Sequence, residues 1–154
     1  MQGQRESVYL SLCVDGVNGQ LSWEWIAGMH HSEICYGVRR WQQDGVDIVV
    51  WDNASSHDEA SVLEIGVPLI HQPTYAPELN PAERVFEELR KELDGLTFRR
   101  LEDKVALVEQ VLRNWTADPA KIQQLCGWDW IRDSIEALKP ELKLAETPAL
   151  KLAA

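Results

Sequence analysis

The chain has 154 residues, of which 45% are hydrophobic and seven are Trp, and its formal net charge is −10 at pH 7. This length fits one domain, and the apolar content suffices for a buried core, which argues against a disordered protein. The acidic balance argues against a stand-alone nucleic-acid-binding module, because such modules present Lys and Arg to phosphates. It does not exclude a catalytic domain whose carboxylates bind divalent metal.

Cysteine usage and hydropathy narrow the class of protein further. Cys13, Cys35 and Cys126 lie far apart without C-x-x-C spacing, so neither a zinc site nor a disulfide framework is predicted. This usage fits a reducing cytoplasm. The polar start resembles no signal peptide, and no apolar run approaches the ~20 residues of a membrane helix. We therefore expect a cytoplasmic protein without membrane contact.

The first part of the chain predicts a β-hairpin and a helix. Residues 7–14 are rich in β-forming side chains, residues 15–19 are dense in turn residues, and residues 20–26 alternate polar with apolar. A helix is predicted from His31 to about Gln43, because its apolar residues recur at spacings of three and four.

A nearly continuous apolar run at 46–51 (VDIVVW) follows, as is typical of a strand buried on both faces. After it we expect a short helix from a capping box at 56–59 to Gly66, a strand at 67–71, a Pro-rich loop at 72–81, and helices at 81–93, 100–115, 119–125 and 129–138. Residues 140–154 have weak periodicity, and we expect a flexible tail there. This order of elements predicts an α/β fold with a mixed sheet and flanking helices.

Asp52 is the first candidate for chemistry. It lies at the end of the most buried predicted strand, and sites in such sheets form at the carboxyl ends of strands. An ionised carboxylate there is costly unless it is paired or bound to metal. A helix-capping role is weakened, because Ser56 and Glu59 already form the next cap. The residues alone leave a structural and a functional role open.

Glu83 has a stronger structural alternative. Asn80, Pro81 and Glu83 occupy the N-cap, first and third positions of a helix, which is a capping arrangement in its own right. Capping is therefore favoured from the residues alone, although a carboxylate in a first turn can also face a cleft. His57 and His71 lack metal-ligand spacing, and supporting roles are the most that their positions indicate.

The remaining motifs point to carboxylate chemistry. The sequence has no Gly-rich phosphate loop and no G-x-S-x-G motif. Carboxylates are hard oxygen ligands suited to Mg²⁺ or Mn²⁺. Arg84, Glu87, Glu88 and Lys91 have the spacing of ion pairs on a solvated helix face.

Three segments resemble one enzyme family. Residues 48–57 (IVVWDNASSH) resemble the strand and D-N-A-x-x-H block of mariner-like DDE transposases, with the closest likeness to the bacterial insertion-sequence branch. Residues 73–86 (PTYAPELNPAERVF) resemble its P-x-Y-x-P-E-L-N-P-x-E-R-x-W block, with Phe86 in place of Trp. Residues 125–131 (LCGWDWI) are similar to its closing Y-x-W-I segment, so the resemblance covers about 5–135.

The resemblance implies an RNase H-like fold, with residues 1–139 as the DDE catalytic domain, and phosphoryl transfer on DNA with two Mg²⁺ or Mn²⁺ ions. It assigns the family's second and third catalytic, metal-binding carboxylates to Asp52 and Glu83. Weaker expectations, for supporting or DNA-contacting roles, fall on Asn53, His57, Asn80 and Arg84.

One departure from the family affects the expected activity. The family's first catalytic Asp lies on a strand before the hairpin, and neither Asp15 in the turn nor Glu6 matches it. We therefore expect an N-terminally truncated domain, without its first strand and first carboxylate, that is inactive alone.

Several partners follow from these expectations. They are transposon-end and target DNA, a separately encoded N-terminal DNA-binding piece, and a second copy pairing at an open sheet edge. The alternative is a catalytically dead remnant that acts as a folded interaction or dimerisation module. An RNase H-like nuclease outside transposition is a weaker third interpretation.

Overall fold

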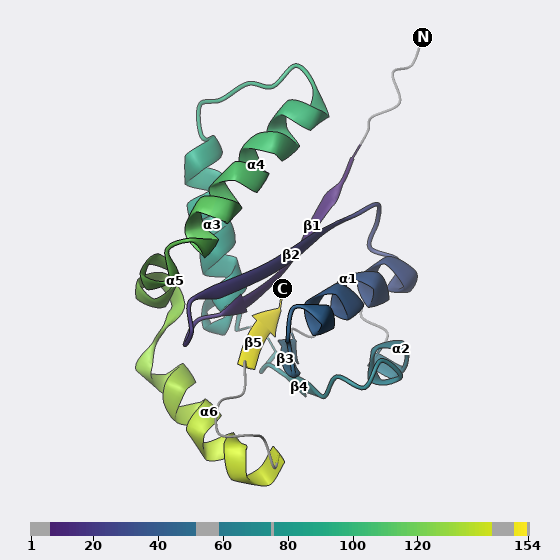
Figure 1. The fold of residues 1–154 in the computed structure, drawn as a ribbon, viewed down its shortest axis with the longest axis vertical. Helices are drawn as coiled ribbons and strands as arrows, with labels where there is room; N and C mark the ends of the chain where they lie inside the picture. Colours follow the sequence, from purple (N-terminus) through teal and green to yellow (C-terminus); the bar gives the residue numbers. More distant parts are fainter. Residues whose placement is uncertain (1–6, 52–58, 75, 143–149, 154) are drawn as a thin grey trace.

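The computed structural model describes residues 7–51, 59–74, 76–142 and 150–153 (Figure 1). In chain order the elements are β1 (Tyr9–Asp15), β2 (Gln20–Ile26), α1 (His31–Gln43), β3 (Ile48–Trp51), α2 (Glu59–Leu63), β4 (Leu69–His71), the 3-10 turn η1 (Pro77–Leu79), α3 (Pro81–Leu93), α4 (Leu101–Thr116), α5 (Pro119–Cys126), α6 (Asp129–Leu142) and β5 (Leu150–Ala153). The sheet order is β2-β1-β5-β3-β4. The pairs β2-β1 and β1-β5 are antiparallel, whereas β5-β3 and β3-β4 are parallel. The predicted mixed α/β architecture is confirmed.

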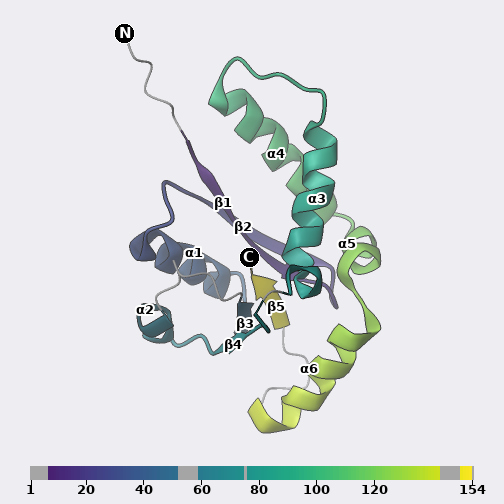
Figure 2. The same cartoon turned by 180° about the vertical axis from the view of Figure 1, so that it is seen from behind.

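Helices cover the two faces of this sheet. Leu12 and Val14 of β1 pack with Val85 of α3 and Leu112 of α4 in one buried cluster. Figure 2 shows α3 crossing in front of the hairpin on this side. On the opposite face, a second cluster joins Cys13 and β3 to α1 and α2. Neighbouring residues of β1 therefore enter different clusters, because successive side chains of a strand point to opposite faces.

The hairpin turn is fixed by its own polar groups. Asp15 is fully buried, and its Oδ1 accepts hydrogen bonds from the backbone N–H groups of Val17 (3.0 Å) and Asn18 (2.9 Å). The Asn18 side chain donates to the other carboxylate oxygen at 2.8 Å. Both oxygens of Asp15 are thus used within the turn. Gly19 closes the turn with φ of 70°, and a Cβ added there would lie 2.1 Å from the carbonyl oxygen of Pro119 in α5.

We predict that Gly19→Ala destabilises the fold far more than Gly45→Ala. Both glycines have positive φ, which costs an alanine roughly 1–2 kcal/mol. Only Gly19 faces backbone at contact distance, whereas nothing lies within 4 Å of a Cβ at Gly45. The clash at Gly19 adds about 1–3 kcal/mol. Urea unfolding of both variants measures this difference, and equal losses of stability would contradict the docking of the turn on α5.

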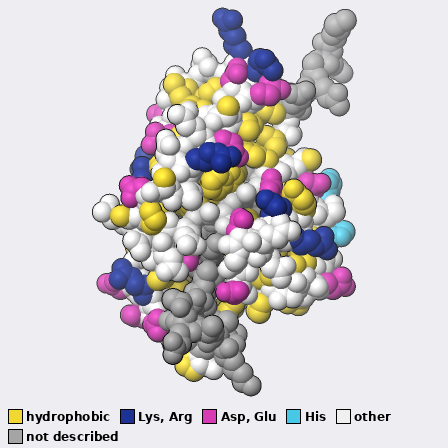
Figure 3. Space-filling model, in the orientation of Figure 1, with side chains coloured by type: hydrophobic (Ala, Val, Ile, Leu, Met, Phe, Trp, Pro, Cys, Tyr) yellow, Lys and Arg dark blue, Asp and Glu magenta, His cyan; other side chains and the backbone are white. Residues whose placement is uncertain are grey.

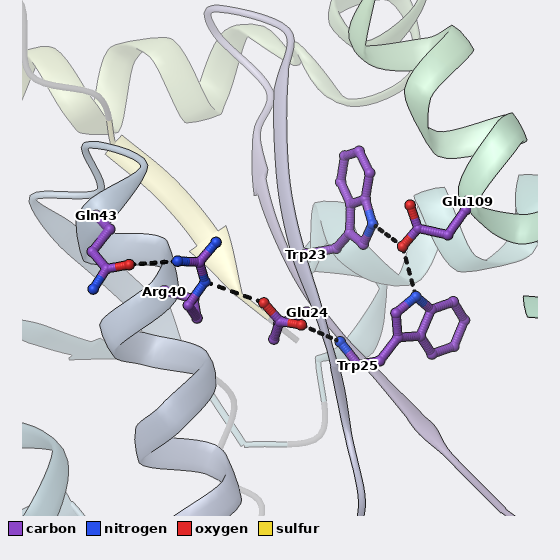
Figure 4. Close-up of polar contacts among 6 residues, drawn as sticks. All are labelled: Trp23, Glu24, Trp25, Arg40, Gln43 and Glu109. Atoms are coloured by element: carbon purple, nitrogen blue, oxygen red, sulfur yellow. Dashed lines mark hydrogen bonds and ion pairs between the residues drawn. The ribbon is translucent and has the colours of Figure 1, made fainter.

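A carboxylate ties α4 to β2 (Figure 4). Oε1 of Glu109 accepts hydrogen bonds from the indole N–H groups of Trp23 (2.9 Å) and Trp25 (2.7 Å). The two tryptophans stand two residues apart on β2, so their side chains share one face of the strand. Partial burial opposes the charge of Glu109, but these donors and Arg113 outweigh it and lower the pKa of the carboxyl group.

We predict that Glu109→Ala lowers the free energy of unfolding by about 1–3 kcal/mol at pH 7, because two indole donors lose a charged acceptor. Glu109→Gln keeps an oxygen acceptor and loses less. Because the folded-state pKa is lowered, the advantage of the carboxylate over Gln is present at neutral pH. It is lost as the pH falls through the lowered pKa of the folded-state carboxyl group, where the carboxylate becomes protonated. Urea unfolding at several pH values measures this, and a wild-type advantage over Gln that does not change with pH would contradict it.

The C-terminal segment differs from the expected tail. Helix α6 continues through Pro140 to Leu142, and residues 150–153 form β5. This strand lies between β1 and β3, which are therefore not adjacent in the sheet. Residues 150–153 thus hold the sheet position between the hairpin and β3. None of the helices in the described part of the chain is long and apolar enough to cross a membrane.

Candidate functional site

Strands β3 and β4 are parallel neighbours, and their carboxyl ends lie at the same end of the sheet. Trp51 pairs with His71, and the N–H of Gln72 donates to the carbonyl of Trp51 at 2.8 Å. Asp52 follows Trp51 in the sequence, so the structure supports the predicted strand that precedes it. Asp52 itself, with Asn53 and His57, lies outside the described residues, and the roles assigned to these three residues stay predictions.

The start of α3 is capped as the sequence predicted. Asn80 is 2% exposed, has extended backbone angles, and accepts the N–H of Ala82 on its side-chain oxygen at 3.0 Å. Pro81 takes the first helical position, where its missing N–H costs nothing. The turn η1 directly precedes Asn80 and delivers the chain to this cap. Asn80 is thus a structural residue that positions the first turn.

Glu83 does not complete the predicted capping arrangement. In a capping box the third-position carboxylate accepts the backbone N–H of the cap residue. Here the N–H of Asn80 instead donates to the carbonyl of Pro77 at 2.9 Å. The half-buried Glu83 carboxylate makes no hydrogen bond or ion pair with any residue the structure describes. A capping role for Glu83 therefore lacks its main hydrogen bond, the one from the Asn80 N–H. The Glu83 carboxylate remains available as an oxygen ligand.

Packing against the hairpin and α5 holds this first turn in place. Ala82 and Val85 are fully buried in the cluster that contains Leu12 and Val14 of β1. The thiol of Cys126, at the end of α5, contacts the carbonyl oxygen of Pro81 at 3.4 Å. Burial raises the pKa of Cys126 to about 12, so the group remains a neutral thiol that can donate. All three cysteines are buried and form no disulfide, as the sequence predicted.

Arg84 forms its ion pairs along its own helix. Its guanidinium pairs with Glu87 at 2.6 Å and with Glu88 at 3.7 Å, and Lys91 also contacts Glu88. The predicted solvated helix face is therefore confirmed. The Arg84 side chain is 42% exposed, so these ion pairs contribute little to stability. They also oppose only weakly the binding of another anion to the Arg84 guanidinium.

An apolar hollow that the sequence analysis missed adjoins the edge where β3 and β4 end. It has a volume of about 190 Å³, and its lining includes Ile70, Pro73, Leu79 and Trp130. Trp130 is 43% exposed, and its ring stacks on that of Trp128 at 5.9 Å. No spacing or motif in the sequence predicted this hollow, because the exposure and stacking of Trp130 depend on the tertiary arrangement.

The described residues do not by themselves form a metal site. No group of three or more His, Cys, Asp or Glu side chains among them is placed to hold an ion. Glu83 nevertheless has the chemistry of a divalent-metal ligand, because it is a partly exposed carboxylate without a partner in that part of the chain. Among the described residues Glu83 thus offers one oxygen ligand of the kind that Mg²⁺ or Mn²⁺ prefers, and Asp52 stays the predicted second ligand.

We predict that Asn80→Ala and Glu83→Gln have different effects on stability, because the side chain of Asn80 caps α3 and that of Glu83 does not. Loss of the cap should lower the free energy of unfolding by about 0.5–2 kcal/mol. Glu83→Gln should stay within about 0.5 kcal/mol of wild type, because no described partner is lost. Thermal and urea unfolding check both values, and a loss at Glu83→Gln as large as at Asn80→Ala would restore the capping role.

Comparison with known proteins identifies a related family. Residues 35–107, from α1 into α4, match the family model described as DDE superfamily endonuclease. The matched segment includes both Asp52 and Glu83. No curated protein and no solved structure gave a significant match. The match supports the DDE superfamily without resolving a branch of it: over residues 35–107, the chain is similar to DDE superfamily endonucleases.

Proposed function

We propose that this chain is the catalytic domain of a transposase-type DNA endonuclease in which Asp52 and Glu83 are catalytic, metal-binding carboxylates. The observation that carries the proposal is the family match across 35–107, combined with a Glu83 side chain that has no described partner in the first turn of α3. The sheet order, with helices on both faces, is compatible with an RNase H-like domain.

The reaction is in-line attack on a DNA phosphodiester, first by water and then by a 3′-hydroxyl. Two Mg²⁺ or Mn²⁺ ions, when bound, supply activation of the nucleophile and stabilisation of the leaving oxygen. Asp52 and Glu83 are the residues of this chain that would hold them. The buried cap of Asn80 fixes the backbone of the first turn, so Glu83 is presented from a rigid element rather than a loop.

The charge distribution supports a DNA-binding partner for this domain. On the face drawn in Figure 3, Lys and Arg side chains are scattered among Asp and Glu and gather into no continuous basic patch. With a net charge of −10, the chain attracts phosphates weakly by itself. The finer parts of the proposal are a mariner-like insertion-sequence transposase that recognises transposon-end and target DNA through a separately encoded N-terminal piece, and that is inactive alone.

A plasmid-nicking assay with Mn²⁺, with and without a polypeptide encoded immediately upstream, tests the proposal. We expect nicking only in the mixture, and a loss of at least roughly 100-fold in Asp52→Asn and in Glu83→Gln, because a missing ligand misplaces the metals. Glu87→Gln is the matched control, since this carboxylate of the same helix pairs with Arg84. It should leave the rate unchanged.

Calorimetric titration with Mn²⁺ provides a second measurement. Binding to the wild-type chain should weaken in Asp52→Asn and Glu83→Gln but not in Glu87→Gln. Nicking that survives both site substitutions would refute the assignment of these carboxylates. A mixture that binds no metal and nicks no DNA would favour the alternative, a dead remnant that serves as an interaction module.

A further inference from the structure

The hairpin turn contains a chemically reactive pair of residues, Asn18 and Gly19. The chain has four asparagines, and Asn18 is the one that a glycine follows. The backbone nitrogen of a glycine can attack the side-chain carbonyl carbon of the preceding asparagine, because no Cβ hinders its approach. A cyclic succinimide forms, and the side-chain nitrogen leaves as ammonia, which takes the amide proton of the glycine. Water then opens the ring to give aspartate or isoaspartate.

The buried Asp15 opposes this reaction in the folded turn. Its backbone carbonyl accepts the Gly19 N–H at 2.8 Å, which keeps the proton on the nitrogen that would attack. Its Oδ2 accepts the Asn18 side-chain amide at 2.8 Å and so fixes the direction of the Asn18 carbonyl group. Asn18 itself is exposed, so water reaches the pair from solvent. Both hydrogen bonds to Asp15 must therefore break before the ring can close.

Aspartate at position 18 does not fit the turn that asparagine stabilises. The amide that donates to Asp15 is replaced by a carboxylate, which has no proton to donate at neutral pH. Two negative charges would then stand at hydrogen-bond distance, and water cannot reach the fully buried Asp15 to screen them. Isoaspartate is a further disturbance, because it leads the main chain through the side-chain carbon and lengthens it.

The turn has no space to absorb a change of shape on the side of α5. Gly19 packs so closely there that an added Cβ would lie 2.1 Å from the carbonyl oxygen of Pro119. The side chain of Gln123, also in α5, donates to the carbonyl of Val17 at 2.7 Å. A displaced turn therefore loses both contacts with α5.

From these observations we propose that Asn18 is a site of spontaneous deamidation, which Asp15 suppresses while the turn is closed. Conversion to aspartate or isoaspartate releases the turn from α5. Because ammonia is lost, modified chains accumulate with the time that the turn spends open. The thiol of Cys126 in α5 contacts Pro81, so the loss extends toward the start of α3 and Glu83. The proposal rests on the turn and not on the endonuclease activity.

The first test compares deamidation in the folded and the unfolded chain. Wild-type protein is incubated at mildly alkaline pH in buffer and in guanidinium chloride, and peptide mass spectrometry follows the conversion of Asn18. We expect conversion in the denaturant to be at least about 10-fold faster, because the two hydrogen bonds to Asp15 are absent there. Asn114 is the internal control and should stay unconverted, because the bulky Trp115 follows it. Equal rates at Asn18 in the two solutions would overturn the proposal.

The second test removes the protecting carboxylate. Asp15→Ala lacks the group that holds the Asn18 side chain, and in buffer we expect its Asn18 to convert roughly 10-fold faster than that of wild type. Asp103→Ala is the matched control, because it removes an exposed carboxylate from α4. A rate in Asp15→Ala equal to that in wild type would refute protection by this side chain. If Asp15→Ala does not fold, the first test decides, because it uses the unaltered chain.

The third test introduces the product directly. Asn18→Asp places a carboxylate in the turn, whereas Asn18→Ala removes the same hydrogen bond without adding a charge. At neutral pH we expect Asn18→Asp to raise the equilibrium constant for unfolding roughly 10-fold more than Asn18→Ala does. Hydrogen exchange of the α5 amides should also be faster in Asn18→Asp than in Asn18→Ala. Exchange at α5 that is equal in the two variants would contradict the release of the turn.

Discussion

The candidate site depends on how the first turn of α3 packs against β1. Ala82 and Val85 share a buried cluster with Leu12 and Val14, and the side chain of Asn80 caps the helix from a buried position. The helix is therefore fixed in both position and starting residue. Without this packing Glu83 would lie on a solvated helix end, where a single carboxylate has little affinity for a divalent ion.

Close approaches of backbone extend this packing to α5. A Cβ added at Gly16 would lie 2.6 Å from the carbonyl oxygen of Cys126, and one at Gly19 would lie 2.1 Å from that of Pro119. The hairpin turn thus touches both ends of α5, while Cys126 contacts Pro81 at the start of α3. The turn, α5 and α3 form one connected unit, so damage at the turn is expected to reach the site as well as the fold.

The centre of the sheet differs from the start of α3, because only a short strand fills it. A four-residue strand that includes Lys151 lies between two strands whose side chains are mostly buried. β3, which precedes Asp52 in the sequence, lies between β5 and β4. The strand that precedes Asp52 is therefore held in the sheet by backbone pairing on both of its sides.

The sequence by itself determined the elements that have a local cause. Turn residues defined the hairpin, apolar spacing defined α1 and α3, and Asn80 with Pro81 defined where α3 begins, because propensity and capping act over a few neighbouring residues. Motif resemblance selected the DDE superfamily, which the family match supports at that level.

Only the tertiary structure decided the long-range arrangement. It showed that Pro77 takes the Asn80 N–H that Glu83 was expected to accept, that Trp130 is exposed beside an apolar hollow, and that β5 lies between β1 and β3. The weak periodicity of residues 140–154 predicted a tail, because strand pairing across more than 100 residues leaves no local pattern when the strand is short. The physical reason is common to all three: each depends on which groups meet in space, and composition and spacing along the chain do not encode that.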